Sequence, residues 1–251
     1  MKQLTDDAIQ AGTITIAGHD GDEIEAYQAR PLGTGPYGAV VVIHHLPGYD
    51  RESKETVRRF AAEGYLAVCP NLYARQGAGL SHEEAAKLVR ERDGGISDEQ
   101  LIGDVAGAAT YLREQDGSNG KVGCIGFCSG GRQAFLAAAN VDLDAAVDCY
   151  GAFVVGNPPE GVPLRAREII DQAPNLRCPL LGLFGNDDQF PSPDQVAALD
   201  KELTRLGKPH EFHSYDGAGH AFFSVDRPSY RPEAAVDGWS KILDFYGRYL
   251  S

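Results

Sequence analysis

A cysteine, an aspartate pair and a histidine stand at three points of the sequence where a polar loop follows an apolar run. Cys128 lies in GFCSGG, Asp187 and Asp188 lie in LFGNDD, and His220 lies in GAGHAFF. A cysteine thiol becomes a strong nucleophile when a histidine accepts its proton and a carboxylate fixes the tautomer of that histidine. These residue types, in the order nucleophile, acid, histidine, therefore predict nucleophilic catalysis by a thiol.

The residues around Cys128 match the sharp turn that exposes a nucleophile between a strand and a helix. The pattern is G-x-nucleophile-x-G, in which Gly126 and Gly130 lack the Cβ atoms that would clash where strand and helix pass closely. The amino end of the following helix carries partial positive charge, which favours the thiolate. A buried cysteine before an ordinary helix would fit this pattern equally well, so the hypothesis depends on the partners Asp188 and His220.

Apolar, β-branched runs alternate with helical patterns along the chain. We expect strands at 38–45, 65–70, 121–128, 143–151, 179–185 and 209–217, and helices at 53–64, 98–115, 129–140, 192–207 and 233–250. Most of these strands are too continuously apolar to face water, which is typical of a parallel sheet covered on both faces. The sequence therefore predicts one α/β domain over residues 1–251, with a single doubly wound, mostly parallel sheet.

Two further segments bear on the edges of this sheet. Residues 13–18 and 23–31 predict an antiparallel hairpin at one side edge.

Ligands bind beyond the carboxyl ends of the strands in such sheets, which is where Cys128, Asp188 and His220 fall. The proline-rich segment 153–175 is long for a connection, so we expect it to lie over the site.

Composition limits the partners and the compartment. A formal charge of −13 over 251 residues would repel phosphates, so we expect neither nucleic acid nor an anionic membrane surface as a partner. The N-terminus lacks the apolar core of a signal peptide and no apolar run approaches the ~20 residues of a membrane span, which predicts a cytoplasmic protein. The expected partner is a small molecule, bound by a monomer or a small homo-oligomer.

The sequence offers little evidence for redox chemistry, metal binding or phosphate binding. The five cysteines are odd in number and scattered, which favours reduced thiols, and Cys124 with Cys128 forms C-x3-C rather than the redox motif C-x2-C. The seven histidines form no H-E-x-x-H motif, and GFCSGG lacks the lysine of a phosphate-binding loop. We therefore expect no metal and no other cofactor.

The three motifs and PNLYARQ at 70–76 resemble the dienelactone hydrolase family, over nearly the whole chain. The resemblance implies an α/β-hydrolase fold and hydrolysis of cyclic enol-lactones such as 4-carboxymethylenebutenolide. It also implies a triad with Cys128 as nucleophile, Asp188 as acid and His220 as base, acting through an acyl-thioester. Asp188 is favoured over Asp187 because the family pattern G-x-x-D ends there.

The resemblance also implies binding roles for residues outside the triad. The segment IHHLPG corresponds to the one that forms the oxyanion hole, so the N–H of Leu46 is expected to act with that of Ser129, whereas Pro47 has no N–H. Arg75, in LYARQ, resembles the arginine that holds the substrate carboxylate, for which a planar guanidinium is well suited.

Two positions depart from the family pattern. His45 stands where the dienelactone enzymes carry a glutamate, and Ser224 where they carry a second carboxylate-binding arginine. The resemblance implies that His45 lies in the substrate site, and the alternative is that it packs in the core. A histidine beside the nucleophile cannot oppose thiolate formation as a glutamate would, so we expect Cys128 to be more fully ionised. Arg165, Arg167 and Arg227 are candidates for the missing positive charge.

These observations predict a hydrolase for a small, anionic lactone or ester. The alternative is a non-catalytic or single-turnover receptor for a small molecule, built on the same fold. Multiple turnover of a lactone distinguishes the two.

Overall fold

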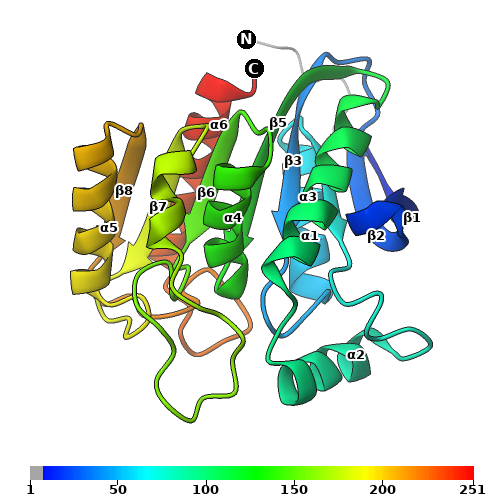
Figure 1. Cartoon of the computed structure of the whole chain (residues 1–251). Coiled ribbons are helices and arrows are strands. Elements are labelled where there is room, and N and C mark those ends of the chain that lie inside the picture. Colours follow the sequence, from blue (N-terminus) through cyan, green and yellow to red (C-terminus); the bar gives the residue numbers. More distant parts are fainter. Residues whose placement is uncertain (1–7) are drawn as a thin grey trace.

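The computed structural model describes residues 8–251, in which an eight-stranded sheet forms the centre of the molecule (Figure 1). The strands are β1 (Ile9–Ala17), β2 (Glu23–Pro31), β3 (Tyr37–Ile43), β4 (Leu66–Pro70), β5 (Ser118–Phe127), β6 (Ala145–Cys149), β7 (Leu180–Gly185) and β8 (His210–Tyr215). Their order across the sheet is β1-β2-β4-β3-β5-β6-β7-β8. The pairs from β4 to β8 are parallel, and β2 pairs antiparallel with β1 and β4. The predicted edge hairpin and mostly parallel sheet are confirmed.

Helices cover both faces of this sheet (Figure 1). They are α1 (Arg51–Ala62), α2 (His82–Leu88), α3 (Asp98–Arg113), α4 (Ser129–Asn140), α5 (Pro193–Leu206) and α6 (Pro232–Tyr249). Shorter helical turns lie at His19–Gly21, Val89–Asp93 and Ile170–Asn175. In the described residues α3, α4 and α5 pack on one face, and α1 and α6 pack on the other. This is the α/β arrangement that the sequence predicts.

The side chains of β3 show why its sequence is continuously apolar. Val41 belongs to the core under α3 and α4, whereas Val40 and Val42 belong to the core under α1 and α6. All three are at most 1% exposed. Successive side chains of a strand point to opposite faces, so a strand covered on both sides needs apolar residues at every position.

The parallel strands all end at one edge of the sheet, and the loops beyond that edge hold the candidate site (Figure 1). The segment between β6 and β7 and helix α2 lie beyond the same edge (Figure 1). None of the helices formed by residues 8–251 combines the length and apolarity needed to cross a bilayer.

Candidate active site

Cys128 forms the corner between β5 and α4. β5 ends at Phe127 and α4 begins at Ser129, so the turn leaves Cys128 alone between the two elements, with φ 58° and ψ −122°. A positive φ is strained for a residue with a Cβ and persists only where the surroundings enforce it. The Cys128 N–H donates to the carbonyl of Cys149 at 3.1 Å, which ties the corner to the end of β6.

The two glycines around Cys128 have the role that the sequence predicts. A Cβ on Gly126 would collide with the backbone of Gly130, since strand and helix pass at contact distance there. Any larger residue at Gly126 would therefore force the turn open and move the thiol.

The side chains of Asp188 and His220 meet at the end of the sheet. Nδ1 of His220 lies 2.8 Å from Oδ2 of Asp188, and Oδ1 of Asp188 accepts the N–H of Phe190 at 2.9 Å. Asp188 is buried, whereas Asp187 is exposed. The aspartate fixes Nδ1 as the protonated nitrogen, which leaves Nε2 available to the thiol of Cys128, and the interaction with Cys128 raises the pKa of His220. The structure therefore brings together the three residues expected to form a triad.

The charges of these groups favour a thiolate and imidazolium pair. Burial would raise the pKa of Cys128, but the hydrogen bond and charge of His220 and the neighbouring amides lower it. Burial would likewise lower the pKa of His220, but the hydrogen bonds with Asp188 and Cys128 raise it well above its ordinary value. A thiolate held at neutral pH is the nucleophilic form of cysteine.

Two backbone amides point at the sulfur of Cys128. They belong to Leu46 and Ser129, the two residues expected to form the oxyanion hole. Two hydrogen bonds fix the loop that carries Leu46: the hydroxyl of Tyr73 donates to the Leu46 carbonyl at 3.0 Å, and His44 donates to the carbonyl of His45, the residue before Leu46. Amides held in this way need little rearrangement as negative charge develops on a substrate oxygen.

His44 is a buried, neutral support for this loop. Its Nε2 accepts the N–H of Leu72 at 3.2 Å, so Nδ1 carries the proton and donates to the carbonyl of His45 at 2.9 Å. Burial lowers the pKa of His44 to about 4, which keeps the ring uncharged at neutral pH. This role of His44 could not be predicted from the sequence, because it depends on Leu72 in the next loop.

Tyr150 is a further neighbour of the triad that the sequence did not suggest. We expected the strand to run to residue 151, but β6 ends at Cys149 and Tyr150 takes a positive φ of 44°. Its ring lies 5.2 Å from the ring of His220 and is 1% exposed. A strained backbone at the carboxyl end of a strand is a signal for a site, but it is visible only in the structure.

A cavity of about 490 Å³ opens beside the nucleophile. Cys128, Ser129 and Leu46 form part of its wall, and the opposite wall includes Phe153 and the segment 164–167. The segment between β6 and β7 therefore lies over the site, as the sequence predicts. Arginine side chains contribute to this wall: Arg132, Arg165 and Arg167.

The structure does not bring Arg75 to this cavity, which corrects its expected role in substrate binding. Its guanidinium donates two hydrogen bonds to Asp104, each of 3.0 Å, and a third to Asp22 of 2.7 Å. Asp104 is fully buried, so its charge requires this partner. Arg75 therefore has a structural role. Arg227 is also absent from the cavity wall.

His45 also lies differently from the expectation. Its Nε2 lies 2.6 Å from Oδ2 of Asp50, and it does not contribute to the wall of the Cys128 cavity. Asp50 in turn accepts the N–H of Ser53 and begins α1 as its N-cap, which favours a carboxylate at this position. His45 is therefore held by α1 rather than facing the thiol. Ser224, at the other departure from the family pattern, is buried beside Tyr150.

Three potential metal ligands gather at the start of α1. Nε2 of His45 and oxygens of Asp50 and Glu52 lie within 4.8 Å of one another. Oδ2 of Asp50 is bonded to His45, and Oδ1 accepts hydrogen bonds from Ser53. The contacts within the chain thus satisfy Asp50 without an ion, and we assign no metal to this cluster.

Comparisons with known proteins agree with this site. The family model described as "Dienelactone hydrolase family" matches residues 24–250. The chain is 33% identical over 241 residues to "Carboxymethylenebutenolidase" of Pseudomonas putida, covering 92% of this chain and 94% of the relative. It is 35% identical over 251 residues to "Putative carboxymethylenebutenolidase" of Yersinia pestis, covering 99% and 92%.

A solved structure is similar over the same length. The "Putative Dienelactone Hydrolase" of Klebsiella pneumoniae superimposes with a TM-score of 0.85 at 33% identity, covering 96% of this chain and all of that one. An acylaminoacyl peptidase of Pyrococcus horikoshii, with a TM-score of 0.72 at 20% identity, shares the fold over 43% of its own length. The match to the family model and these relatives extend over nearly the whole chain, and this protein therefore belongs to the dienelactone hydrolase family.

Proposed function

We propose that this lactone and ester hydrolase uses Cys128 as a nucleophile and passes through an acyl-thioester. The observation that carries the proposal is the hydrogen bond between Asp188 and His220 beside a cysteine on a strained turn, where His220 and two backbone amides lower the pKa of the thiol. An alcohol nucleophile would need its proton removed during attack, whereas the imidazolium here supports a thiolate in advance.

The first half of the reaction forms the thioester. The sulfur of Cys128 attacks the carbonyl carbon, and the carbonyl π electrons move to the oxygen, which accepts hydrogen bonds from the N–H groups of Leu46 and Ser129. When the carbonyl re-forms, the bond from carbon to the ester oxygen breaks. That oxygen takes the Nε2 proton of His220. In a lactone the new hydroxyl or enol stays attached to the acyl group.

The second half releases the acid. Neutral His220 accepts a proton from water as the water oxygen attacks the thioester carbon, and the same two amides hold the oxyanion. The bond between carbon and sulfur breaks, and the electron pair returns to Cys128 as thiolate. Asp188 holds the imidazole orientation through both halves and stabilises its charged form. One water is consumed for each ester bond.

Positive charge on the cavity wall favours an anionic substrate. Arg165 and Arg167 are exposed and line the cavity that contains Cys128. Arg132 is buried and already paired with Asp98 at 3.0 Å, so it is less able to bind a substrate carboxylate. A guanidinium binds a carboxylate well, and the two exposed arginines replace Arg75 in our proposal.

A screen of lactones and aryl esters with purified protein tests the proposal. We expect many turnovers per protein molecule on at least one anionic lactone or ester, and a loss of roughly a thousandfold or more in Cys128→Ala, as for removal of a nucleophile. Cys178→Ala removes a buried thiol remote from the cavity and serves as the matched control. Stoichiometric binding without turnover would support the receptor alternative, and full activity in Cys128→Ala would exclude the mechanism.

A further inference from the structure

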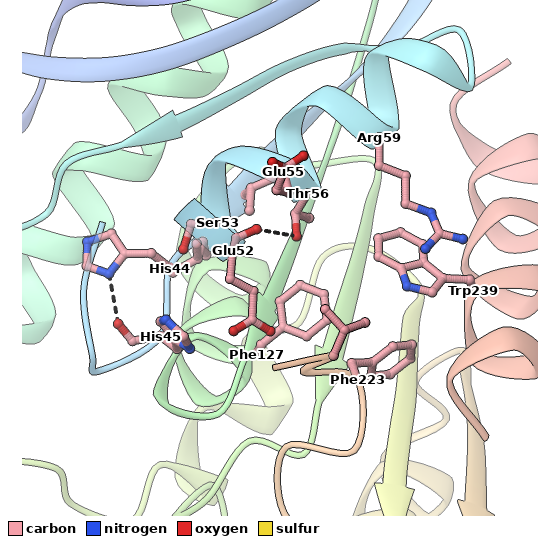
Figure 2. A pocket seen from close by; sticks show the side chains of 13 residues that line it. His44, His45, Glu52, Ser53, Glu55, Thr56, Arg59, Phe127, Phe223 and Trp239 are labelled. Atoms are coloured by element: carbon pink, nitrogen blue, oxygen red, sulfur yellow. Dashed lines mark hydrogen bonds between the residues drawn. The ribbon is translucent and has the colours of Figure 1, made fainter. Parts of the chain in front are cut away.

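A second, smaller cavity lies on the other side of the nucleophile turn. It has a volume of about 150 Å³ and lies between α1, α6 and the segment that follows His220 (Figure 2). Its lining includes Glu52, Thr56, Phe127, Phe223, Val225 and Trp239. Nothing in the mechanism above occupies this space.

The two cavities share the backbone that carries the reacting groups. Phe127 lines the smaller cavity, and the next residue, Cys128, lines the larger one. His45 lines the smaller cavity, and the next residue, Leu46, lines the larger one. The nucleophile and one oxyanion donor therefore stand at the boundary between the cavities.

The walls of the two cavities differ in chemistry. The smaller one has aromatic sides formed by Phe127, Phe223 and Trp239, and Glu52 extends toward Phe127 within it (Figure 2). The guanidinium of Arg59 also lines it but lies 3.8 Å from the centroid of the Trp239 ring. The smaller cavity has two glutamates against one arginine on its wall, which disfavours an anion, whereas the larger has three arginines against Asp98 and Glu99, which favours one.

We propose that the smaller cavity is the alcohol-side subsite and takes a compact aromatic or branched alkyl alcohol, so that the enzyme hydrolyses open-chain esters of anionic acids. The inference rests on the function proposed above. An ester carbonyl at Cys128 directs its acyl and alcohol halves away from each other. The acyl half then lies by Arg165 and Arg167, and the alcohol half passes Phe127 into the aromatic space. A small lactone ring, whose two halves are joined, would leave this cavity unused.

Esters that share one acid and differ only in the alcohol isolate this subsite. Methyl and benzyl monoesters of succinate have the same anionic acyl half, and their alcohols are of similar acidity, so a difference in kcat/KM reports contacts of the alcohol. We expect the parent enzyme to prefer the benzyl ester by about tenfold or more, within the range that apolar pockets achieve. Equal kcat/KM values for the two esters would overturn the proposal.

Filling the cavity should remove that preference selectively. Thr56→Trp places a large ring against the α1 wall, and Val225→Trp does so from the 65% exposed Val225 at the rim. We expect each variant to lose about tenfold in kcat/KM on the benzyl ester and to stay within about twofold on the methyl ester. Val225→Trp keeps the test decisive if Thr56→Trp does not fold, because the side chain it replaces is not part of the core.

Val236→Trp is the matched control. Val236 is 69% exposed on α6 and contributes to neither cavity. We expect it to retain the benzyl preference of the parent. Equal losses on both esters in a folded Val225→Trp protein, or the same selective loss in Val236→Trp, would overturn the subsite. Cys128→Ala, assayed in parallel, reports separately on the proposed function, because it should abolish turnover of both esters.

Discussion

The nucleophile depends on a small set of contacts around one sulfur atom. The imidazole of His220 and the amides of Ser129 and Leu46 lower the pKa of the Cys128 thiol against the effect of burial. The two amides stabilise negative charge, which the thiolate has before attack and the carbonyl oxygen gains afterwards. The same donors can therefore serve the resting enzyme and the intermediate.

Removing the imidazolium should make the thiol harder to ionise. We expect the pH midpoint of iodoacetamide labelling at Cys128 to lie below that of an ordinary thiol in the parent and to rise in His220→Gln. The sign follows because His220 lowers the pKa of Cys128, so its loss returns the pKa upward. Labelling rates between pH 5 and 10, located by peptide mass, measure this. His210→Gln, at a histidine on β8 paired with Asp200, is the control. An unchanged midpoint in His220→Gln would contradict the ion pair.

At the scale of elements, hydrophobic periodicity predicted most of the fold. Continuous apolar runs identified β3 to β7, because a strand buried on both faces has no polar positions. Helix α2 was missed although its start carries a signal: Ser81 and Glu84 form a capping box at its N-terminus. The motif S-x-x-E in LSHEE would have predicted it. Its short length gave too little periodicity to recognise.

The grouping of Cys128, Asp188 and His220 was predictable, whereas the contacts of Arg75 and His45 were not. The three residues follow strands whose ends must meet at one edge, so their order and their loops predicted that they lie together. The orientations of Arg75 and His45 depend on Asp104 and Asp50, which compete with substrate for these side chains. A buried carboxylate is stabilised by a nearby cation, and tertiary packing rather than local sequence determines which cation lies beside it.

Arg75 should therefore affect stability rather than specificity. It links the loop after β4 to α3 and to the turn His19–Gly21, through Asp104 and the carbonyl of His19. Arg75→Ala leaves the carboxylate of Asp104 buried without its partner, which we expect to lower the free energy of unfolding by about 3 kcal/mol. Urea denaturation measures this. Discrimination between anionic and neutral esters should stay as in the parent. A selective loss on anionic esters with unchanged stability would restore the substrate-binding role.

At the scale of the whole molecule, one buried carboxyl couples folding to pH. Asp148 is fully buried at the end of β6, beneath the first turn of α4, and its Oδ2 has no hydrogen-bond partner. Burial raises its pKa from 3.8 to about 7, although the N–H of Gly151 opposes this by donating to Oδ1. The folded protein therefore favours the neutral carboxyl.

This carboxyl should cost stability as the pH rises. A raised pKa in the folded state contributes stability that is complete below pH 3.8 and is lost as the pH passes about 7. The difference corresponds to at most roughly 4 kcal/mol. We expect Asp148→Asn, which keeps the acceptor for Gly151 and cannot ionise, to be more stable than the parent at pH 9, and by a clearly smaller margin at pH 5. Chemical denaturation at both pH values measures this. Parallel pH dependence in the two proteins would show that Asp148 is not the responsible group.

Isolation of the acyl-thioester would demonstrate nucleophilic catalysis by Cys128. Mixing His220→Gln with an aryl ester at pH 9 and quenching in acid should trap the acyl group, because that variant lacks the base that activates water. We predict an intact-mass increase equal to one acyl group, located by peptide mapping on Cys128, and no increase in the double variant Cys128→Ala, His220→Gln. An acyl group on another residue, or turnover by the parent with no acyl-enzyme under any quench time in either protein, would contradict nucleophilic catalysis by Cys128.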